Sequence, residues 1–509
     1  MGGEDNCAAW LPKHASERGA QLAIVDEDRR LSYAELEVRV QRAAGHLASL
    51  GVRRGDRVAL LLRNRSAYLE LLFAAARLGA IASPLNARLT AAEIRHPLSD
   101  STPAVLAVES DLQATADAAC AELGAPPARI VCGGESDAYE QALAAASPWS
   151  DVAPVSPDDP MILMYTSGTT GVPKGALLPH RKTLYNSLNA NLFFDLEARD
   201  RVLVVLPLFH SFGLAILAIP TLHAGGSVWI QQGFDPERVW SSVAEHGISF
   251  FGGVPTMFRA LLDALDAQPG RWSLRSLRFL FTAGAAIPVE LVQAFEAHGL
   301  VLKQGFGQTE TSILCCLDAQ DALRKAGSVG RPVHHVELRV VQRDTLERPP
   351  AAWQDVAVGE VGEIVAKGPI TMIGYWQRPD ATAEVLRDGW LRTGDLATLD
   401  DEGFLTLEGR ARDMYISGGE NVYPAELEAV YEEHPAIREI AVKGVPDGRW
   451  GETGHAFCVL ERGHELDAAA LREWGAQRLA GFKLPSQFLA VPELPRTESG
   501  KVQKHLLGV

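Results

Sequence analysis

Hydrophobic positions over roughly the first 400 residues follow two spacings in turn, one typical of helices and one typical of strands. Apolar residues recur every three or four positions in 33–50 and 67–78, which predicts amphipathic helices. Short runs rich in β-branched and aromatic residues predict strands at 58–62, 161–165, 202–206, 248–251 and 277–282. Helical stretches such as 236–246 and 288–298 lie between them. This alternation predicts an α/β fold built from βαβ units, with mixed or mostly parallel sheets and flanking helices.

The pattern changes after residue 409. A helix at 423–433, strands at 437–445 and 455–460 and a helix at 466–479 predict a small α+β unit of about 100 residues. The sequence therefore predicts a large N-terminal domain (1–408), a connection rich in Arg and Gly (409–412) and a small C-terminal domain (413–509).

Composition narrows the class of protein. A chain of 509 residues exceeds what one core supports, in agreement with two domains. The 48 basic and 64 acidic side chains leave a net charge of −16, which disfavours nucleic acid as a partner. The most apolar stretch near the middle, 212–222, is too short to span a bilayer. The N-terminus lacks a basic, apolar leader and the six cysteines lack CxxC spacing, so we expect a cytoplasmic protein with reduced thiols.

A glycine- and hydroxyl-rich segment, TSGTTGVPKG at 166–175, is the strongest local signal. Glycine reaches the positive φ angles of an anion-binding backbone nest, hydroxyl groups add donors, and a lysine adds a cation. The segment therefore favours polyphosphate binding over the alternative of a plain surface turn, although it does not match the Walker A pattern. The candidate phosphate-binding residues are Thr166, Ser167, Gly168, Thr169, Thr170, Gly171 and Lys174.

This segment resembles the signature of the adenylate-forming (AMP-binding) superfamily, which includes acyl-CoA synthetases, peptide-synthetase adenylation domains and firefly-type luciferases. Five further matches follow in the order of that superfamily: PLFH at 207–210, GFGQTE at 305–310, TGD at 393–395, GRARD at 409–413 and PRTESGK at 495–501. The whole chain resembles bacterial fatty-acyl-CoA ligases. The resemblance implies ATP, Mg²⁺ and coenzyme A as reactants or cofactors.

The implied reaction has two half-reactions. A carboxylate first attacks the α-phosphorus of ATP to give an acyl-adenylate, and a thiol then displaces AMP. The resemblance assigns Glu310 to Mg²⁺, Thr309 to a phosphate oxygen and Lys501 to the charge that develops during adenylation. His210 is expected beside the acyl carboxylate; a carboxylate nucleophile needs no general base at neutral pH.

The remaining motif residues are assigned to the nucleotide and to CoA. Asp395 and Arg410 are expected to contact the ribose, since a carboxylate suits a diol. The resemblance places Gly284, Ala285 and Ala286 on the adenine, and Gly305, Phe306 and Gly307 in the same nucleotide site. Gly418 and Gly419 are expected to let a pantetheine arm pass when the small, mobile domain rotates about the hinge at 409–412.

The sequence indicates the type of reaction more narrowly than it indicates the substrate. The candidate pocket walls are apolar and uncharged, which favours an uncharged apolar acid over malonate or an amino acid; they are Phe209, Phe212, Phe251, Gly305, Phe306, Ile313 and Leu314. We expect an acyl-CoA ligase for a medium- or long-chain fatty acid. The alternatives are an aryl-CoA ligase for benzoate- or hydroxycinnamate-type acids, and an adenylating enzyme that loads a carrier protein. Partners are expected to be small molecules, and the sequence leaves a homodimer open.

Overall fold

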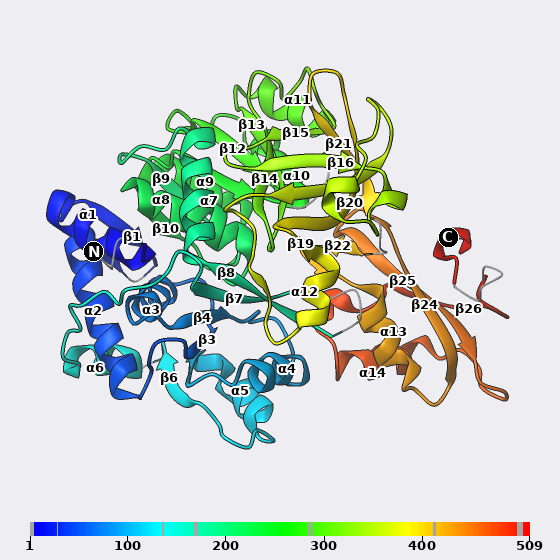
Figure 1. The fold of residues 1–509 in the computed structure, drawn as a ribbon, viewed down its shortest axis with the longest axis horizontal. Coiled ribbons are helices and arrows are strands. Elements are labelled where there is room, and N and C mark those ends of the chain that lie inside the picture. Colours follow the sequence, from blue (N-terminus) through cyan, green and yellow to red (C-terminus); the bar gives the residue numbers. More distant parts are fainter. Residues whose placement is uncertain are drawn as a thin grey trace.

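The computed structural model describes residues 5–27, 29–134, 137–166, 172–283, 287, 289–410, 414–495 and 502–508. It has the predicted α/β fold, in which a large N-terminal domain of sheets and helices carries a smaller C-terminal domain on one side (Figure 1). Two of the four residues of the predicted hinge, 411 and 412, lie outside the described part, so the domain boundaries remain predictions.

A first sheet, seven-stranded within the described residues, has a parallel centre. Its strands, in spatial order, are β18 (Gly374–Tyr375), β8 (Lys174–Pro179), β7 (Pro160–Thr166), β4 (Ile81–Pro84), β3 (Arg57–Leu61), β5 (Val105–Glu109) and β6 (Ala128–Cys132). The strands from β7 to β6 are parallel, whereas β8 and β18 join antiparallel at one edge.

The second sheet is larger, with fourteen strands among the described residues. Its parallel half consists of β1 (Leu22–Val25), β9 (Arg201–Val204), β10 (Ser227–Ile230), β11 (Phe250–Gly253), β12 (Phe279–Thr282) and β13 (Leu302–Gln308). The antiparallel strands are β2 (Arg30–Ser32), β14 (Ser312–Leu317), β15 (Ser328–Pro332), β16 (Glu337–Val341), β17 (Gly362–Lys367), β19 (Leu386–Arg387), β20 (Trp390–Leu399) and β21 (Leu405–Arg410).

Helices fill the space between the two sheets and cover their outer faces. Between the sheets lie α2 (Tyr33–Ser49), α3 (Ser66–Arg77), α7 (His180–Phe194) and α8 (Ile219–Ala224). Helices α4 (Ala91–Ser101) and α5 (Gln113–Cys120) cover the first sheet, and α9 (Pro236–His246), α10 (Pro255–Ala267) and α11 (Val289–Ala297) cover the second. The other helices of this domain are α1 (Trp10–Arg18), α6 (Ala138–Ala145) and α12 (Pro379–Val385).

Local chemistry explains several of these elements. Helix α2 begins at a capping box, in which Ser32 and Glu35 satisfy each other's backbone N–H groups. Every residue of α3 is buried, which fits its almost uniformly apolar sequence and its place between the sheets. The apolar segment 212–222 forms a buried π-helix, η3 (Phe212–Ala218), that continues into α8. In the described part of the chain, no helix combines the length and the apolarity that crossing a bilayer requires.

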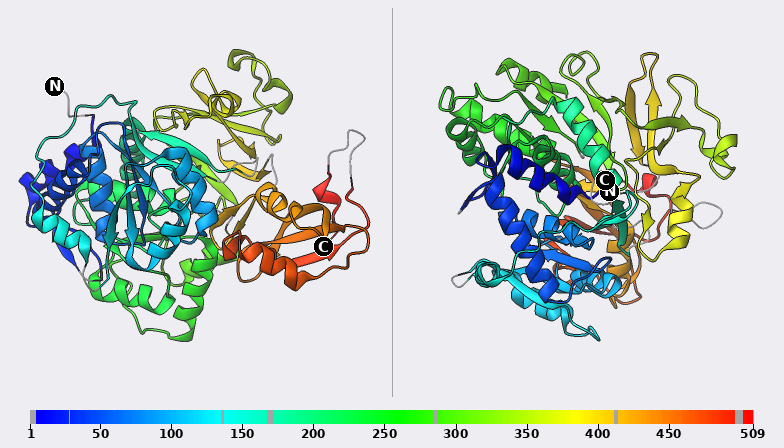
Figure 2. Two further views of the ribbon diagram at one scale, coloured as in Figure 1. Left: turned by 90° about the horizontal axis from the view of Figure 1, so that it is seen from below. Right: turned by 60° about the vertical axis from the view of Figure 1, so that its left-hand side comes forward.

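The smaller C-terminal domain projects from one side of the molecule (Figure 2, left). Its sheet contains β22 (Tyr415–Ser417), β23 (Glu420–Val422), β24 (Ile437–Asp447), β25 (Gly451–Leu460) and β26 (Gln487–Ala490), against which α13 (Pro424–Glu432) and α14 (Ala468–Ala476) pack. These elements match the helix–strand–strand–helix pattern predicted from the sequence.

Candidate active site

A cavity of about 550 Å³ lies where parallel strands of both large sheets end and where the small domain meets them. Strands β7 and β13 deliver polar residues at their C-terminal ends, and the loop after β9 delivers a histidine. The cavity brings together the predicted residues Thr166, Lys174, His210, Gly305, Phe306, Gly307, Thr309, Glu310 and Gly419. Residues from distant motifs therefore share one site.

Several predicted residues fall outside the described residues. These are Ser167, Gly168, Thr169, Thr170 and Gly171 of the phosphate loop, Gly284, Ala285 and Ala286 of the adenine segment, and Lys501. The described ends of these segments, Thr166, Lys174 and Ala283, all line the cavity. The roles of the residues outside the described part remain predictions.

Glu310 lies in the tight turn between β13 and β14, and its carboxylate faces hydroxyl groups from two other segments. Tyr375 in β18 donates a hydrogen bond to Glu310 Oε1 at 2.9 Å, and Thr166 Oγ1 lies 3.4 Å from the same oxygen. The ammonium of Lys174 lies 5.5 Å from the centre of the Tyr375 ring. A half-exposed carboxylate among hydroxyl oxygens is a donor set that a hard cation prefers, so these residues fit Mg²⁺.

Asp395 lies just behind the cavity wall and is tied to the loop that carries Glu310. Asp395 is 3% exposed. The side-chain Nε2 of Gln308 donates one hydrogen bond to Asp395 Oδ2 and another, at 2.7 Å, to the carbonyl oxygen of Thr393. In the ladder between β20 and β21, Asp395 lies opposite Arg410. The two predicted ribose contacts are therefore neighbours in the backbone ladder, and Gln308 couples Asp395 to the turn bearing Glu310.

We expect Gln308→Leu to raise the KM for ATP by about tenfold while kcat changes less. Leucine has no donor for Asp395, so the hydrogen bond from Gln308 that helps to hold the carboxylate in the position that suits a ribose is lost. Steady-state kinetics with varied ATP would check this. An unchanged KM for ATP would mean that Gln308 does not orient Asp395.

His210 stands at the junction of the main cavity with two openings at the domain interface. Burial lowers the pKa of His210 below its ordinary value, so the ring is neutral at pH 7. Its Nδ1 accepts a hydrogen bond from the backbone N–H of Phe212 at 3.3 Å. A neutral ring that is fixed in this way can contact the acyl group without adding charge.

The inner end of the cavity is apolar, with aromatic rings crossing at steep angles. The rings of Phe212 and Phe281 are 5.6 Å apart in an edge-to-face arrangement, and Ile216, Phe306 and Ile313 complete this end. Gly305 is required here because a Cβ would lie 2.5 Å from Cζ of Phe281. The inner end of the cavity is therefore apolar and uncharged, which is the character that the sequence predicts for the acyl pocket.

Three of the predicted pocket walls are wrong. Phe251 is fully buried in a different core, where it packs against Trp240 and Phe258 on the other face of the sheet. Leu314 points away from the cavity because its neighbour Ile313 faces it, and successive side chains of a strand alternate. Phe209 lines the crevice between the domains.

The structure adds residues that the sequence did not indicate. Tyr375 reaches Glu310 because β18 pairs with β8, a contact between distant segments that no local motif encodes. Phe281 and Ile216 had been assigned only to buried elements. Asn421 and Tyr423, from the small domain, line the same cavity.

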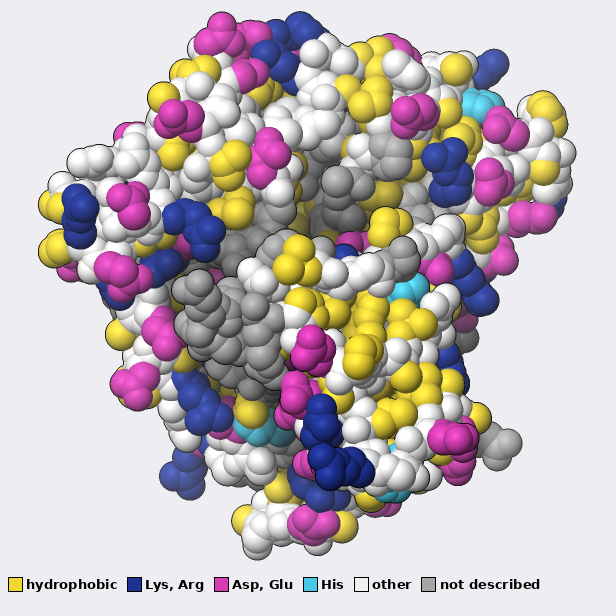
Figure 3. All heavy atoms as spheres, turned by 90° about the vertical axis from the view of Figure 1, so that its right-hand side faces the viewer, with side chains coloured by type: hydrophobic (Ala, Val, Ile, Leu, Met, Phe, Trp, Pro, Cys, Tyr) yellow, Lys and Arg dark blue, Asp and Glu magenta, His cyan; other side chains and the backbone are white. Residues whose placement is uncertain are grey.

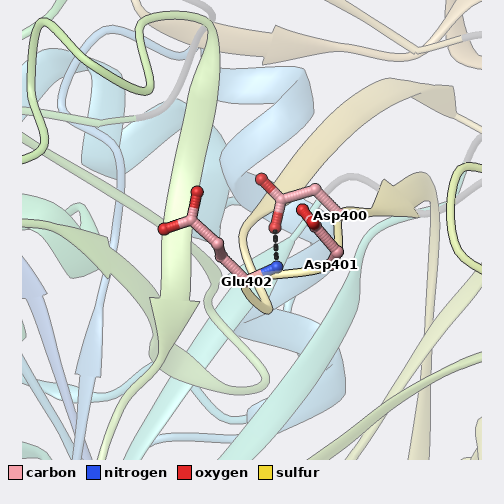
Figure 4. Close-up of side chains that lie close together, drawn as sticks. All are labelled: Asp400, Asp401 and Glu402. Atoms are coloured by element: carbon pink, nitrogen blue, oxygen red, sulfur yellow. Dashed lines mark hydrogen bonds between the residues drawn. The ribbon is translucent and has the colours of Figure 1, made fainter.

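An acidic cluster lies in the turn between β20 and β21 (Figure 4). Asp400 accepts hydrogen bonds at 2.9 Å from the backbone N–H groups of Glu402 and Phe404, which stabilise the turn. Lys325 lies 2.6 Å from carboxylate oxygens of both Asp400 and Glu402. The cluster is therefore accounted for by turn geometry and ion pairing.

The side of the molecule that carries the small domain is hollowed between its upper and lower parts (Figure 3). Acidic and basic side chains are interspersed around this hollow rather than gathered by sign.

Comparison with known proteins matches the two parts of the chain separately. Residues 11–376 match the model of the AMP-binding enzyme family, and residues 426–501 match that of the AMP-binding enzyme C-terminal domain. The chain belongs to the AMP-binding enzyme family. It is an AMP-forming acid–thiol ligase of the acyl- or aryl-CoA type that works through an adenylate, with ATP and CoA as co-substrates.

Relatives resemble this ligase over nearly its whole length. A feruloyl-CoA synthase from Amycolatopsis is 41% identical, covering 97% of each chain. An indoleacetate–CoA ligase from Aromatoleum aromaticum is 40% identical, covering 97% of this chain and 96% of the relative. A long-chain-fatty-acid–CoA ligase from Mycobacterium tuberculosis is 36% identical, covering 94% of this chain and 93% of the relative.

One solved enzyme resembles the ligase to different degrees in two of its structures. A double mutant of the o-succinylbenzoate CoA synthetase of Bacillus subtilis, 33% identical and bound to a CoA product analogue, matches with a TM-score of 0.88, covering 97% of both chains. The same enzyme in complex with its acyl-adenylate matches with a TM-score of 0.72, covering 98% of this chain and 97% of the other. Since sequence identity is equal in the two cases, the difference reflects conformation.

Proposed function

We propose that the ligase activates a compact aryl carboxylic acid. The observation that carries this proposal is the apolar inner end of the cavity, where the edge-to-face rings of Phe212 and Phe281 fit a further flat ring. The nucleotide takes up part of the 550 Å³, so the space left suits a compact acyl group better than a long chain. Ser211 adds a buried hydroxyl that has no partner among the described residues and can serve a substrate oxygen.

The names of the relatives support the same class. The relatives described above at 41% and 40% identity are named for feruloyl and indoleacetate groups, both of which contain an aromatic ring. A fatty acid, expected from the sequence, is the second candidate because the 36% identical ligase is named for long-chain fatty acids. The uncharged walls accept either class, and only their shape favours the aryl acid.

The first half-reaction uses the polar end of the cavity. The substrate carboxylate forms a bond to the α-phosphorus of ATP and pyrophosphate leaves, which gives the acyl-adenylate. Asp395 and Arg410 would hold the ribose, Thr309 and Lys174 would contact phosphate oxygens, and Lys501 would balance the charge that develops. Glu310 would hold Mg²⁺, which supplies positive charge to the triphosphate. His210, which is neutral, does not have to accept a proton in this step, because the substrate carboxylate that acts as the nucleophile is already ionised.

The second half-reaction needs a route for the thiol. A crevice between the domains, of about 550 Å³, shares His210, Thr166 and Thr309 with the main cavity. A thiol that arrives through the domain interface would reach the acyl carbonyl beside His210, displace AMP and release a proton. The better match to the relative's CoA-analogue complex supports the assignment of this domain arrangement to the thiol step.

A panel of carboxylic acids with ATP and free CoA tests the proposal. It should include hydroxycinnamates, arylacetates, benzoate and straight-chain acids of increasing length, with AMP and acyl-CoA measured separately. The proposal expects the highest kcat/KM for aryl acids. A preference for long-chain acids would replace it with the second candidate, and AMP release without acyl-CoA would favour a carrier protein as acceptor.

We expect Phe281→Leu to shift the preference from aryl to straight-chain acids, changing the ratio of their kcat/KM values by about tenfold. Leucine removes the ring face against which the aryl group packs and leaves more room at the inner end. The control is Phe279→Leu on the same strand, whose ring packs against Phe194 and Phe250 in the core. Equal ratios in the two variants would show that Phe281 does not set selectivity.

A further inference from the structure

A buried lysine joins the two domains close to the crevice. Lys483, in the 3₁₀ turn η6 (Gly481–Lys483) of the small domain, lies 2.7 Å from Glu426 Oε1 in α13 of the same domain. Its ammonium also lies 2.9 Å from Glu93 Oε1 in α4 of the large domain. The three side chains are 6%, 10% and 8% exposed, so this is a buried bridge across the interface.

Helix geometry fixes the position of Glu93. It is the third residue of α4, and its Oε2 accepts hydrogen bonds at 2.8 Å from both the N–H and the hydroxyl of Thr90 in a capping box. The other oxygen is left facing Lys483. The cap therefore holds the carboxylate in place before the small domain arrives, which reduces the entropy lost when the bridge forms.

The charges give the two carboxylates different roles. Within the small domain Lys483 and Glu426 already form a neutral pair, whereas Glu93 is contributed by the other domain. Burial raises the pKa of Glu426, and Lys483 opposes that effect. Burial lowers the pKa of Lys483, but Glu426 and Glu93 together outweigh burial and raise it. The second carboxylate thus stabilises the lysine charge only while the domains are in contact.

The same interface carries the catalytic surface of the small domain. Glu420 pairs with Arg88 of the large domain at 3.1 Å, and Gly419, Asn421 and Tyr423 line the main cavity. Arg88 is about half exposed, so this second ion pair is the weaker of the two. The buried bridge is therefore the stronger polar contact that places this loop against the site.

We propose that Glu93 and Lys483 are positioning residues for thioester formation, because their bridge holds the small domain in the arrangement used by the thiol. This inference rests on the proposed two-step function and on the assignment of the observed arrangement to its second step. The bridge plays no part in adenylation, for which the small domain has to present Lys501 to the cavity. Its loss therefore affects one half-reaction and spares the other.

The test is Glu93→Gln in the full-length protein. Glutamine also serves in a capping box, so α4 keeps its cap, while the negative charge that faces Lys483 is lost. Lys483 keeps Glu426, so the small domain retains its own ion pair. Thioester formation from purified acyl-adenylate at saturating CoA is expected to fall about tenfold, with single-turnover adenylation in the absence of CoA changing less than twofold.

The matched control is Glu122→Gln. Glu122 pairs with Arg95 of α4 at 2.8 Å, but this bridge is exposed and lies wholly within the large domain. The control is expected to match the wild type in both half-reactions, because exposed pairs contribute little. A melting temperature for each variant shows whether either change unfolds the protein.

Three results would overturn the inference. Equal losses in both half-reactions would make Glu93 a general structural residue, and a thiol step no slower than that of Glu122→Gln would show that the bridge does not position the domain. A defect that disappears at saturating CoA would assign Glu93 to CoA binding. A wild-type protein that converts no acyl-adenylate to acyl-CoA would overturn the proposed function as well, so the two failures are distinguishable.

Discussion

Lys501→Ala is expected to lower the rate of acyl-adenylate formation by about 10²- to 10³-fold and to leave thioester formation from a supplied acyl-adenylate within about twofold of the wild type. The lysine balances charge that develops as the carboxylate attacks the α-phosphorus, whereas the thiol attacks the acyl carbonyl, so in the second step charge develops first at a different atom. Pyrophosphate exchange measures the first half-reaction, and CoA consumption with synthetic acyl-adenylate measures the second.

Lys504→Ala is the control for this prediction. Lys504 lies three residues further on and pairs with Glu428 at 2.8 Å within the small domain. We expect this variant to retain both half-reactions. If Lys501→Ala lost both half-reactions equally, or if Lys504→Ala showed the same split, the role assigned to Lys501 would be wrong.

Glu310→Gln is expected to have the second large effect, slowing adenylation by roughly 10²-fold and raising the Mg²⁺ concentration needed for half-maximal rate. A neutral amide is a weaker ligand for a hard cation, while the similar shape of glutamine can keep the contact with the Tyr375 hydroxyl. Adenylation rates over a Mg²⁺ titration would measure this, together with binding of a fluorescent ATP analogue with and without the metal.

Glu347→Gln is the matched control for Glu310. Glu347 also lines the cavity, but its side chain is 80% exposed and its nearest basic partner, Arg392, is 3.8 Å away. This variant should keep the wild-type dependence on Mg²⁺. An unchanged Mg²⁺ requirement in Glu310→Gln would remove Glu310 as the metal ligand and leave its interaction with Tyr375 as a structural one.

Local patterning was sufficient to predict much of the fold. The helix predicted at 236–246 is α9, whose start is marked by the Asp235 cap and Pro236. The predicted strands at 58–62 and 161–165 match β3 and β7 to within one residue, because a parallel central strand is continuously apolar. In these elements the spacing of apolar residues and, for the helix, the capping residues indicate the same element that the structure contains.

The antiparallel half of the second sheet was harder to predict. This half includes pairs over long separations, such as that of β15 with β21, and short segments such as β15 itself, which contains Gly330 and Pro332. Glycine and proline are read as turn residues in a single sequence, and only pairing with neighbouring strands makes such a segment extended. These segments are therefore strands because of their tertiary contacts, and local propensity alone does not predict them.

The candidate active site also combines residues that local motifs indicate with contacts that only the fold creates. Motifs indicated Thr166, His210, Glu310 and Lys174, which do line one cavity. The contact between Gln308 and Asp395 joins residues 87 positions apart, and the bridge from Glu93 to Lys483 joins residues 390 positions apart. Nothing in the local sequence encodes such pairs, because folding alone brings them together. The packing of the Phe212 and Phe281 rings at the inner end of the cavity is also a product of the fold, which explains why the reaction was easier to predict than the substrate.

The most direct test of the account is to follow the ligase with ATP and an aryl acid by mass spectrometry, first without CoA and then after CoA is added. We expect acyl-adenylate and pyrophosphate in the first stage. In the second stage we expect acyl-CoA and AMP in equal amounts, with loss of the adenylate. Formation of ADP in place of AMP, or of acyl-CoA with no acyl-adenylate as its precursor, would contradict the two-step reaction through an adenylate.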